Sequence, residues 1–301
     1  MEMEKCRTPI VSVIMSIYNQ QNREQLESAI MSVLQQSFTD FEFIIYNDGS
    51  NETVSRYLKE FEVLDKRIVL INNPQNHGLA YSLNTCIDVA KGKYLARMDD
   101  DDICMPERLM RQVQFLEAHP EISYVGCNAF LLDDSGIWGE RKMPENPGKQ
   151  DFLRYSPFIH PTVLIRCAVF DGTVAYRTSK DTWRCEDYEL FMRLWKLGHR
   201  GCNLQESLFC YREDRNSYKK RKFRYRLDEM KLRYRNFKEM GMLYPFGWIQ
   251  VLRPLIAAIA PSFVIIGVKR LYHIREKRYE KRVGKKMESV PESVAERSGT
   301  V

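Results

Sequence analysis

The sequence predicts an α/β fold built on a mostly parallel β-sheet, and the order of patterns in the first hundred residues supports this. Four β-rich apolar runs alternate with segments whose apolar residues recur at helical spacing. Parallel strands joined by right-handed helical crossovers are the usual result of such an alternation. The four predicted strands are residues 10–19, 41–50, 67–73 and 93–99.

Polar and glycine residues set the bounds of the predicted helices. A first helix is expected over residues 23–36, and Ser50 or Asn51 can cap a second one after the next strand. A third helix is expected to begin after Gly78 and to end at Gly92.

The second half of the chain is less regular. Residues 121–136 indicate a strand and a turn, and residues 158–170 indicate another strand region. Residues 185–198 predict a helix, with Leu194 and Leu197 facing the core.

Composition excludes several classes of protein. The proportions of 44% hydrophobic and 29% charged residues are ordinary for a soluble globular protein. The amino terminus lacks the basic-then-apolar order of an export signal. Eight cysteines without a C-x-x-C spacing indicate reduced thiols in a cytosolic environment rather than a disulfide framework or a zinc site.

Four consecutive aspartates, Asp99–Asp102, directly follow the fourth predicted strand. Ligands of parallel sheets gather beyond the carboxyl ends of the strands. Adjacent carboxylates repel one another, and Mg²⁺ or Mn²⁺ relieves the repulsion because these ions favour carboxylate oxygens. Alternate residues of an extended segment point the same way, so the acting pair is Asp99 with Asp101 or Asp100 with Asp102. A solvated charge run without a ligand is the alternative.

Six short motifs resemble, in order and spacing, those of family 2 glycosyltransferases, which have the GT-A fold. The match covers roughly residues 9–200, and the motifs are VSVIMSIYN, YNDGS, NHGLAYSLN, KGKYLARMDDDDI, HPTVLIR and CEDYELFMRL. The resemblance implies a metal-dependent, inverting enzyme that transfers a hexosyl or N-acetylhexosaminyl group from a nucleotide donor, for which we expect a UDP-sugar. The processive members carry Q-x-x-R-W, whereas QVLRP at 250–254 lacks the tryptophan, so we expect a non-processive enzyme.

The resemblance also assigns the donor site. It implies that Asp48 contacts the nucleoside and that Asp99 and Asp101 form a D-x-D pair, with Asp101 the closer ligand of Mn²⁺ or Mg²⁺. Asp100 stands where many relatives have a small residue, which puts the choice of ligands in doubt, and we include it among the donor contacts. The remaining residues expected at the nucleotide are Ile17, Tyr18 and Asn19.

A base near the acceptor is the second requirement of this chemistry, because the attacking hydroxyl must lose its proton. Glu186 and Asp187 open a predicted helix, and the resemblance assigns the base to Asp187 and an orienting role to Glu186. An acidic first turn that only complements the helix dipole is the alternative. His160 and Trp183 are further candidates for donor or acceptor contacts, although packing alone would also explain each of them.

The carboxyl-terminal region is strongly basic. Residues 212–286 hold 22 Lys and Arg against 7 Asp and Glu, whereas residues 1–211 hold 23 against 30. This pattern indicates an anionic membrane surface, nucleic acid, or a solvated helix. The longest uncharged run, Pro254–Val268, has fifteen residues, fewer than the ~20 needed to span a bilayer. We therefore expect residues 219–286 to lie on an anionic membrane, with a true span as the alternative and no nucleic-acid partner.

These inferences predict one GT-A domain with a carboxyl-terminal extension. Its nucleotide-sugar-binding half is residues 1–110, and its acceptor-binding half is residues 111–215. A basic, amphipathic, membrane-associating helical region follows at 216–286, and residues 287–301 are expected to form a disordered tail. The predicted acceptor is a lipid-linked or envelope glycan, and the predicted location is the cytoplasmic face of the membrane.

Two other functions remain open at this point. Another metal-dependent phosphate enzyme, such as a phosphatase with an aspartate nucleophile, would suit aspartates after a strand, but it leaves Asp48 and CEDYEL unexplained. A non-catalytic glycan- or membrane-binding module is the other, against which Asp101 and Asp187 argue.

Overall fold

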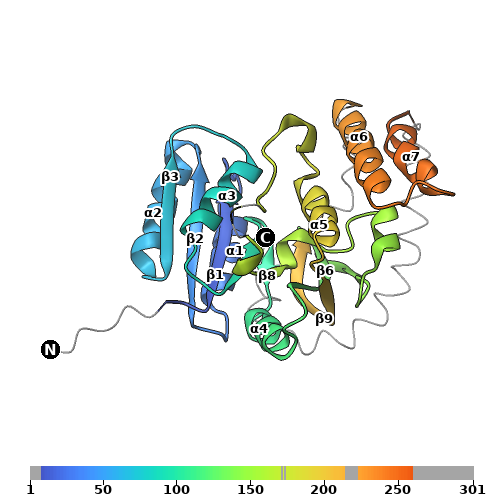
Figure 1. Cartoon of the computed structure of the whole chain (residues 1–301). Coiled ribbons are helices and arrows are strands. Elements are labelled where there is room, and N and C mark those ends of the chain that lie inside the picture. Colours follow the sequence, from blue (N-terminus) through green and yellow to red (C-terminus); the bar gives the residue numbers. More distant parts are fainter. Residues whose placement is uncertain (1–7, 171, 173, 214–222, 260–301) are drawn as a thin grey trace.

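The computed structural model describes residues 8–170, 172, 174–213 and 223–259. Within them a nine-stranded sheet carries helices on both faces (Figure 1). The strands are β1 (Val11–Ile17), β2 (Phe41–Asp48), β3 (Ile68–Asn73), β4 (Tyr94–Met98), β5 (Ile103–Cys104), β6 (Tyr124–Asp133), β7 (Gly136–Arg141), β8 (Leu164–Arg166) and β9 (Gly201–Arg212). The helices are α1 (Arg23–Leu34), α2 (Glu52–Leu64), α3 (Leu79–Val89), α4 (Arg108–Ala118), α5 (Glu186–Lys196), α6 (Phe223–Glu239) and α7 (Gly247–Ile259).

The sheet follows the order β3-β2-β1-β4-β8-β6-β9-β5, with β7 paired to β6. The first four strands in this order are parallel, as are β6 and β9, whereas β8 runs antiparallel to both β4 and β6. The prediction of a mostly parallel sheet is therefore confirmed. Because β8 pairs with β4, strands from both predicted halves of the domain share one sheet.

Two hydrophobic layers enclose the sheet. Helices α1, α2 and α4 bury Leu26, Leu58 and Leu116 against one face. Helices α3, α5 and α6 bury residues such as Leu83 and Phe237 against the other. Residues of β2 are buried along its whole length, as expected for a strand covered on both sides.

The elements predicted for the first hundred residues are present, with one correction. Asn51 caps α2 by accepting a hydrogen bond from the amide of Val54. Helix α3 starts after Gly78 but ends at Val89 rather than at Gly92. A Cβ on Gly92 would lie 2.6 Å from the amide nitrogen of Ser12, so this glycine is needed for a close approach of two chain segments.

The second half departs further from prediction. Of residues 158–170, only Leu164–Arg166 form a strand, flanked by two 3₁₀ turns. The predicted helix at 185–198 is present as α5, but Leu197 lies beyond its end and is 57% exposed rather than facing the core. Strands β7 and β9 were not predicted. Strand β9 depends on pairing with the distant β6, whereas β7 forms a hairpin with β6 directly after the predicted turn.

The basic region contributes two helices to the described part of the chain. Helices α6 and α7 pack side by side next to α5 (Figure 1). No helix among the described residues has the length and apolar character needed to cross a bilayer. The part of the predicted membrane region that follows Ile259 lies outside the described residues, as does the predicted tail at 287–301.

None of the seven cysteines in the described residues forms a disulfide. Six of them are buried, because a free cysteine packs as a small apolar side chain. The described residues therefore contain no disulfide framework, in line with the prediction.

Candidate active site

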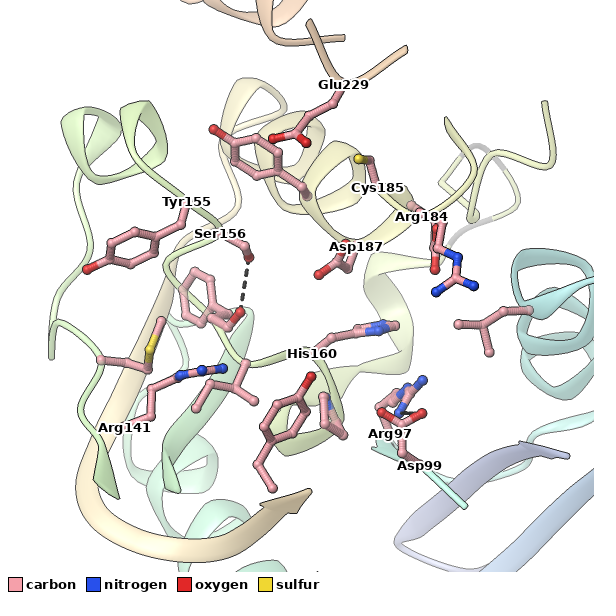
Figure 2. A pocket seen from close by; sticks show the side chains of 18 of the residues that line it. Arg97, Asp99, Arg141, Tyr155, Ser156, His160, Arg184, Cys185, Asp187 and Glu229 are labelled. Atoms are coloured by element: carbon pink, nitrogen blue, oxygen red, sulfur yellow. Dashed lines mark hydrogen bonds and ion pairs between the residues drawn. The ribbon is translucent and has the colours of Figure 1, made fainter. Parts of the chain in front are cut away.

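A cavity of about 790 Å³ opens beside the carboxyl end of β4 and beneath the start of α5 (Figure 2). Segments far apart in the sequence meet around it, including residues of α6 and α7. Its lining comprises Leu79, Arg97, Asp99, Arg141, Lys142, Met143, Tyr155, Ser156, Phe158, Ile159, His160, Pro161, Arg184, Cys185, Glu186, Asp187, Tyr188, Tyr211, Glu229, Arg233 and Arg253.

The aspartate run forms a tight loop after β4. Carboxylate oxygens of Asp99, Asp101 and Asp102 lie within 4.8 Å of one another. Asp102 is buried, and its Oδ1 accepts a hydrogen bond of 2.7 Å from the backbone amide of Arg212. The Arg212 Nε donates to the backbone oxygen of Asp101 at 3.0 Å. The end of β9 therefore holds this loop in place.

The electrostatics of the loop favour binding of a cation. Burial and the neighbouring carboxylates raise the pKa of Asp100 to about 7. Burial and the charge of Asp99 also raise the pKa values of Asp101 and Asp102. The Oδ2 of Asp102 is buried and has no hydrogen-bond partner among the described residues. Three converging carboxylates with an unpartnered oxygen fit a divalent cation that prefers oxygen ligands.

The geometry extends the predicted D-x-D pair. Asp99 and Asp101 both belong to the cluster, and Asp102, predicted only as a partner of Asp100 in the alternative pair, joins them. Asp100 is not a member of this cluster. Alternation along an extended strand fails as a guide here, because β4 ends at Met98 and the aspartates form a turn.

Asp187 and Glu186 lie in the first turn of α5 and face the same cavity. Figure 2 shows Asp187 and His160 bordering one space, with Arg97 and Asp99 on the adjoining wall. Burial and the adjacent Asp187 raise the pKa of Glu186. The arrangement brings a carboxylate and the aspartate loop to one cavity, which is what a transfer with a proton acceptor requires.

His160 is buried at the base of this cavity. Its Nε2 lies 2.7 Å from the hydroxyl of Tyr176, which is itself buried. Burial, and to a lesser degree the charge of Arg97, lower the pKa of His160 well below its usual value. The ring is therefore neutral near pH 7, and it can take part in hydrogen bonds without adding charge.

The residues predicted at the nucleotide lie at the ends of β1 and β2. Asn19 has a left-handed backbone with φ of 50°, and its Oδ1 accepts a hydrogen bond of 2.8 Å from the amide of Asn51. This bond joins the loops that follow the two strands. Tyr18 is 53% exposed beside it, whereas Ile17 is fully buried in the core.

Asp48 is almost fully buried and supports a neighbouring loop. Its carboxylate accepts hydrogen bonds from the Asn76 side chain and from the amides of His77 and Gly78, at 2.8–2.9 Å. Gly49, with φ of 73°, allows the approach, because a Cβ there would lie 2.6 Å from the Gln75 carbonyl carbon. Asp48 is not among the residues that line the main cavity.

Trp183 lies in a second hollow of about 400 Å³ next to the main cavity. The two hollows share Leu79, Arg184 and Glu186. Trp183 is 47% exposed, so its ring is open to a ligand and is not packed in the core.

Sequence reasoning missed three features of the site. Arg97 carries a charge within an apolar strand, which is a signal that could have been read. The clamp at Arg212 and the cavity residues Glu229 and Arg233 on α6 depend on contacts across the fold, and no local pattern announces them.

Solved structures share this architecture. TarS 1–349 of S. aureus in complex with UDP-GlcNAc aligns with a TM-score of 0.60 over 92% of this chain and 91% of that chain, at 15% identity. The mannosyltransferase PcManGT of Pyrobaculum calidifontis, in complex with GDP-Man and Mn²⁺, aligns with a TM-score of 0.57 over 89% of this chain and 81% of that chain, at 14% identity. The fold is therefore the GT-A fold, as predicted.

Sequence comparison identifies the family. The profile of glycosyl transferase family 2 matches residues 12–173. The putative glycosyltransferase EpsE of Bacillus subtilis is 38% identical over 85% of this chain and 92% of EpsE. The amylovoran biosynthesis glycosyltransferase AmsE of Erwinia amylovora is 31% identical over 70% of this chain and 79% of AmsE. The chain belongs to glycosyl transferase family 2, and it is a glycosyltransferase rather than a phosphatase or a binding module.

Proposed function

We propose that this glycosyltransferase moves a sugar from a UDP-sugar to a hydroxyl of a glycan acceptor by a metal-assisted inverting displacement. One observation carries the proposal: Asp99, one member of the aspartate cluster, and Asp187 line the same cavity. The nucleotide sugars named for TarS and PcManGT, UDP-GlcNAc and GDP-Man, support a nucleotide-sugar donor.

The aspartate loop is the proposed metal site. Asp99, Asp101 and Asp102 would hold Mn²⁺ or Mg²⁺, which acts as a Lewis acid that neutralises charge on the donor diphosphate. Arg212 keeps the loop in the conformation that brings these oxygens together. Mn²⁺ in the PcManGT complex supports a divalent ion at such a site without deciding between the two.

Asp187 is the proposed general base. Its place in the first turn of α5 keeps the carboxylate at the cavity wall, where it can accept the proton of an attacking hydroxyl. Glu186 next to it lines both hollows and is proposed to orient donor or acceptor. Trp183 and His160 are proposed contacts to these sugars, Trp183 through the face of its ring.

The nucleotide is proposed to lie over the loops that follow β1 and β2. The bond between Asn19 and Asn51 shapes this surface, and Tyr18 is exposed beside it. Asp48 is proposed to have two roles. It supports the loop at His77 and Gly78, and it would contact a nucleoside at the edge of that loop. Ile17, which is buried, would contribute shape rather than direct contact.

Metal-dependent turnover of nucleotide sugars tests the proposal. Purified enzyme is screened for hydrolysis or transfer of UDP- and GDP-sugars with Mn²⁺, with Mg²⁺ and with excess chelator. Asp101→Ala should abolish turnover, because it removes a ligand from the loop, while the melting temperature changes little. Asp88→Ala, on the exposed side of α3, is the matched control and should keep full turnover. Full turnover in excess chelator would refute the metal role.

The acceptor is proposed to be a lipid-linked or envelope glycan. The name of AmsE, which refers to amylovoran biosynthesis, supports polysaccharide assembly. The positive side chains at the rim of the cavity include Arg141, Lys142 and Arg253, which are partly or largely exposed. Such a rim suits an acceptor that carries phosphate or carboxylate groups.

Attachment to an anionic membrane is proposed through an apolar surface at α7. Several large apolar side chains on and just before α7 are exposed together, which is unusual for a protein surface, and Tyr244 is 90% exposed. Residues 260–286, which follow α7 in the sequence, include nine Lys and Arg but only two Glu. Aromatic and aliphatic groups next to positive charge suit an anionic lipid surface. The α7 surface comprises Tyr244, Phe246, Trp248, Ile249, Leu252 and Ile256.

Helix α6 has a different role from the one its composition suggests. Arg226 and Arg233 form ion pairs with Glu229, and Arg235 pairs with Asp181. Arg235, and Arg233 through a hydrogen bond to the backbone oxygen of Leu153, connect α6 to the domain, whereas the ion pair of Arg226 lies within the helix. The proposed membrane contact therefore rests on α7 and the residues that follow it.

Vesicle flotation tests the membrane proposal. The wild type should float with phosphatidylglycerol vesicles, bind phosphatidylcholine vesicles weakly, and detach in high salt. Trp248→Ser combined with Leu252→Ser should reduce flotation at least severalfold. Val63→Ser combined with Leu64→Ser, on the exposed side of α2, is the matched control and should float as the wild type does. Equal binding to neutral and anionic vesicles in high salt would favour a true span, and binding to nucleic acid alone would refute the membrane proposal.

A further inference from the structure

Arg97 is a buried cation in the wall of the main cavity, and it has no part in the proposed metal binding or proton transfer. It lies in β4 between Ala96 and Met98, both of which are fully buried. The Arg97 side chain itself is only 4% exposed. Burial of a guanidinium costs several kcal/mol unless partners replace its lost water.

The partners that the protein supplies are incomplete. Nη1 of Arg97 forms an ion pair with the carboxylate of Asp99. Its Nε is buried and has no hydrogen-bond partner among the described residues. A guanidinium has five N–H donors, and His160 close by is neutral and brings no compensating charge. The side chain therefore retains capacity for an anionic ligand.

Asp99 connects Arg97 to the proposed metal site. The carboxylate of Asp99 contacts the guanidinium of Arg97. The same carboxylate lies within 4.8 Å of carboxylate oxygens of Asp101 and Asp102. An anion held by a cation on this loop would lie next to Arg97. Phosphate oxygens match the planar fork of a guanidinium especially well.

We propose that Arg97 is a second cationic anchor for the diphosphate of the nucleotide-sugar donor, beside the divalent cation on the aspartate loop. The inference rests on the proposed function, because it assumes a donor with a diphosphate. It gives a binding role to Arg97, which lies within the motif KGKYLARMDDDDI but had no role assigned to it there.

The step in which this anchor acts is the displacement at the anomeric carbon. The bond between that carbon and the diphosphate oxygen breaks, and its electron pair stays on the diphosphate. The acceptor oxygen forms the new bond to the carbon, and its proton passes to Asp187. Negative charge grows on the diphosphate during the step, and N–H donors of Arg97 stabilise it.

Nucleotide binding without turnover provides the test. Calorimetry measures the affinity of wild type, Arg97→Gln and Arg97→Lys for UDP and for uridine, each with Mn²⁺ and with excess chelator. Arg97→Gln should bind UDP about 10–100-fold more weakly in both conditions, the range for one lost charged hydrogen bond. Uridine affinity should not change, because uridine has no phosphate. Arg97→Lys should lose less, because it keeps the charge but not the fork.

Arg193→Gln is the matched control. Arg193 is also largely buried and ion-paired, to Glu189 on α5, but it does not line the cavity. Its loss should leave UDP affinity unchanged, which separates lost phosphate contact from general loosening of the fold. If Arg97→Gln does not fold, the smaller but phosphate-specific loss expected for Arg97→Lys carries the test.

The outcomes separate this inference from the proposed function. If the wild type binds no nucleoside diphosphate, the proposed donor class is wrong and the inference fails with it. If the wild type binds UDP and a folded Arg97→Gln binds it equally well, only the inference fails. Equal losses for UDP and uridine would show that Arg97 only supports the fold, which also overturns the inference.

Discussion

The two ends of the sheet place their site residues by different means. In the part built from β1 to β4, polar residues lie at the carboxyl ends of parallel strands: Asp48 is the last residue of β2, and Asp99 follows β4 directly. In the part built from β6 to β9, the contributing residues are spread over turns, an antiparallel strand and two further helices. Arg212, the last residue of β9, reaches back to Asp101 and Asp102 across about 110 residues of sequence.

This difference teaches that a site position can be read from local sequence where the topology is regular. Carboxyl ends of parallel strands necessarily meet at one edge of a sheet, so residues placed there converge. Residues brought together by irregular strand pairing have no local sequence pattern that predicts their convergence. Four variants distinguish the two cases, beginning with the largest expected effect.

Asp187→Asn tests a residue that the sequence did indicate in the irregular part. The amide keeps the shape but cannot accept a proton, so transfer should fall by about 10²–10⁴-fold. UDP affinity, measured by calorimetry, should change little. Asp181→Asn, a half-exposed neighbour, serves as control and should keep the wild-type rate. Parallel loss of UDP binding and rate would assign Asp187 a structural role.

Arg212→Gln tests a residue that only the tertiary structure revealed. It removes the bond from Nε to the backbone of Asp101 and the ion pair with Asp134, while the amide that serves Asp102 remains. Metal affinity, measured by Mn²⁺ titration, should fall about 10–100-fold, the range for lost support of metal ligands. Arg111→Gln, in an exposed pair with Glu206, should leave it unchanged. Equal affinities for both variants would show that the aspartate loop needs no clamp.

Asp48→Asn tests whether the residue at the end of β2 mainly stabilises the loop at residues 76–78 or also contacts the nucleotide. Its amide cannot accept all three of the bonds from residues 76–78, so denaturant unfolding should show a loss of about 1–3 kcal/mol. Asn51→Ala, which removes the cap of α2, should cost ~1 kcal/mol and leave UDP affinity unchanged. A drop in UDP affinity with Asp48→Asn alone would confirm the predicted nucleoside contact. Unaltered stability and affinity would leave Asp48 without either role.

His160→Gln tests a buried group through pH. The folded pKa of His160 is depressed, so the unfolded chain binds the extra proton first. Stability of the wild type should therefore fall as pH drops below about 6.5, the ordinary pKa of histidine. The melting temperature of His160→Gln should decline less between pH 7 and pH 5 than that of the wild type. Identical slopes would mean that His160 is not neutral in the folded protein.

The sequence by itself determined the α/β fold class, the first four strands, and the placement of the aspartate run and of Asp187. These depend on periodicity, turn residues and short motifs, all of which are local. Only the tertiary structure decided that Asp102 joins Asp99 and Asp101 in one carboxylate cluster, that Arg97 is buried beside Asp99, and that residues of α6 and α7 complete the cavity. The physical reason is that burial and pairing depend on which distant segments pack together, and packing energy is summed over the whole fold rather than encoded in any one segment.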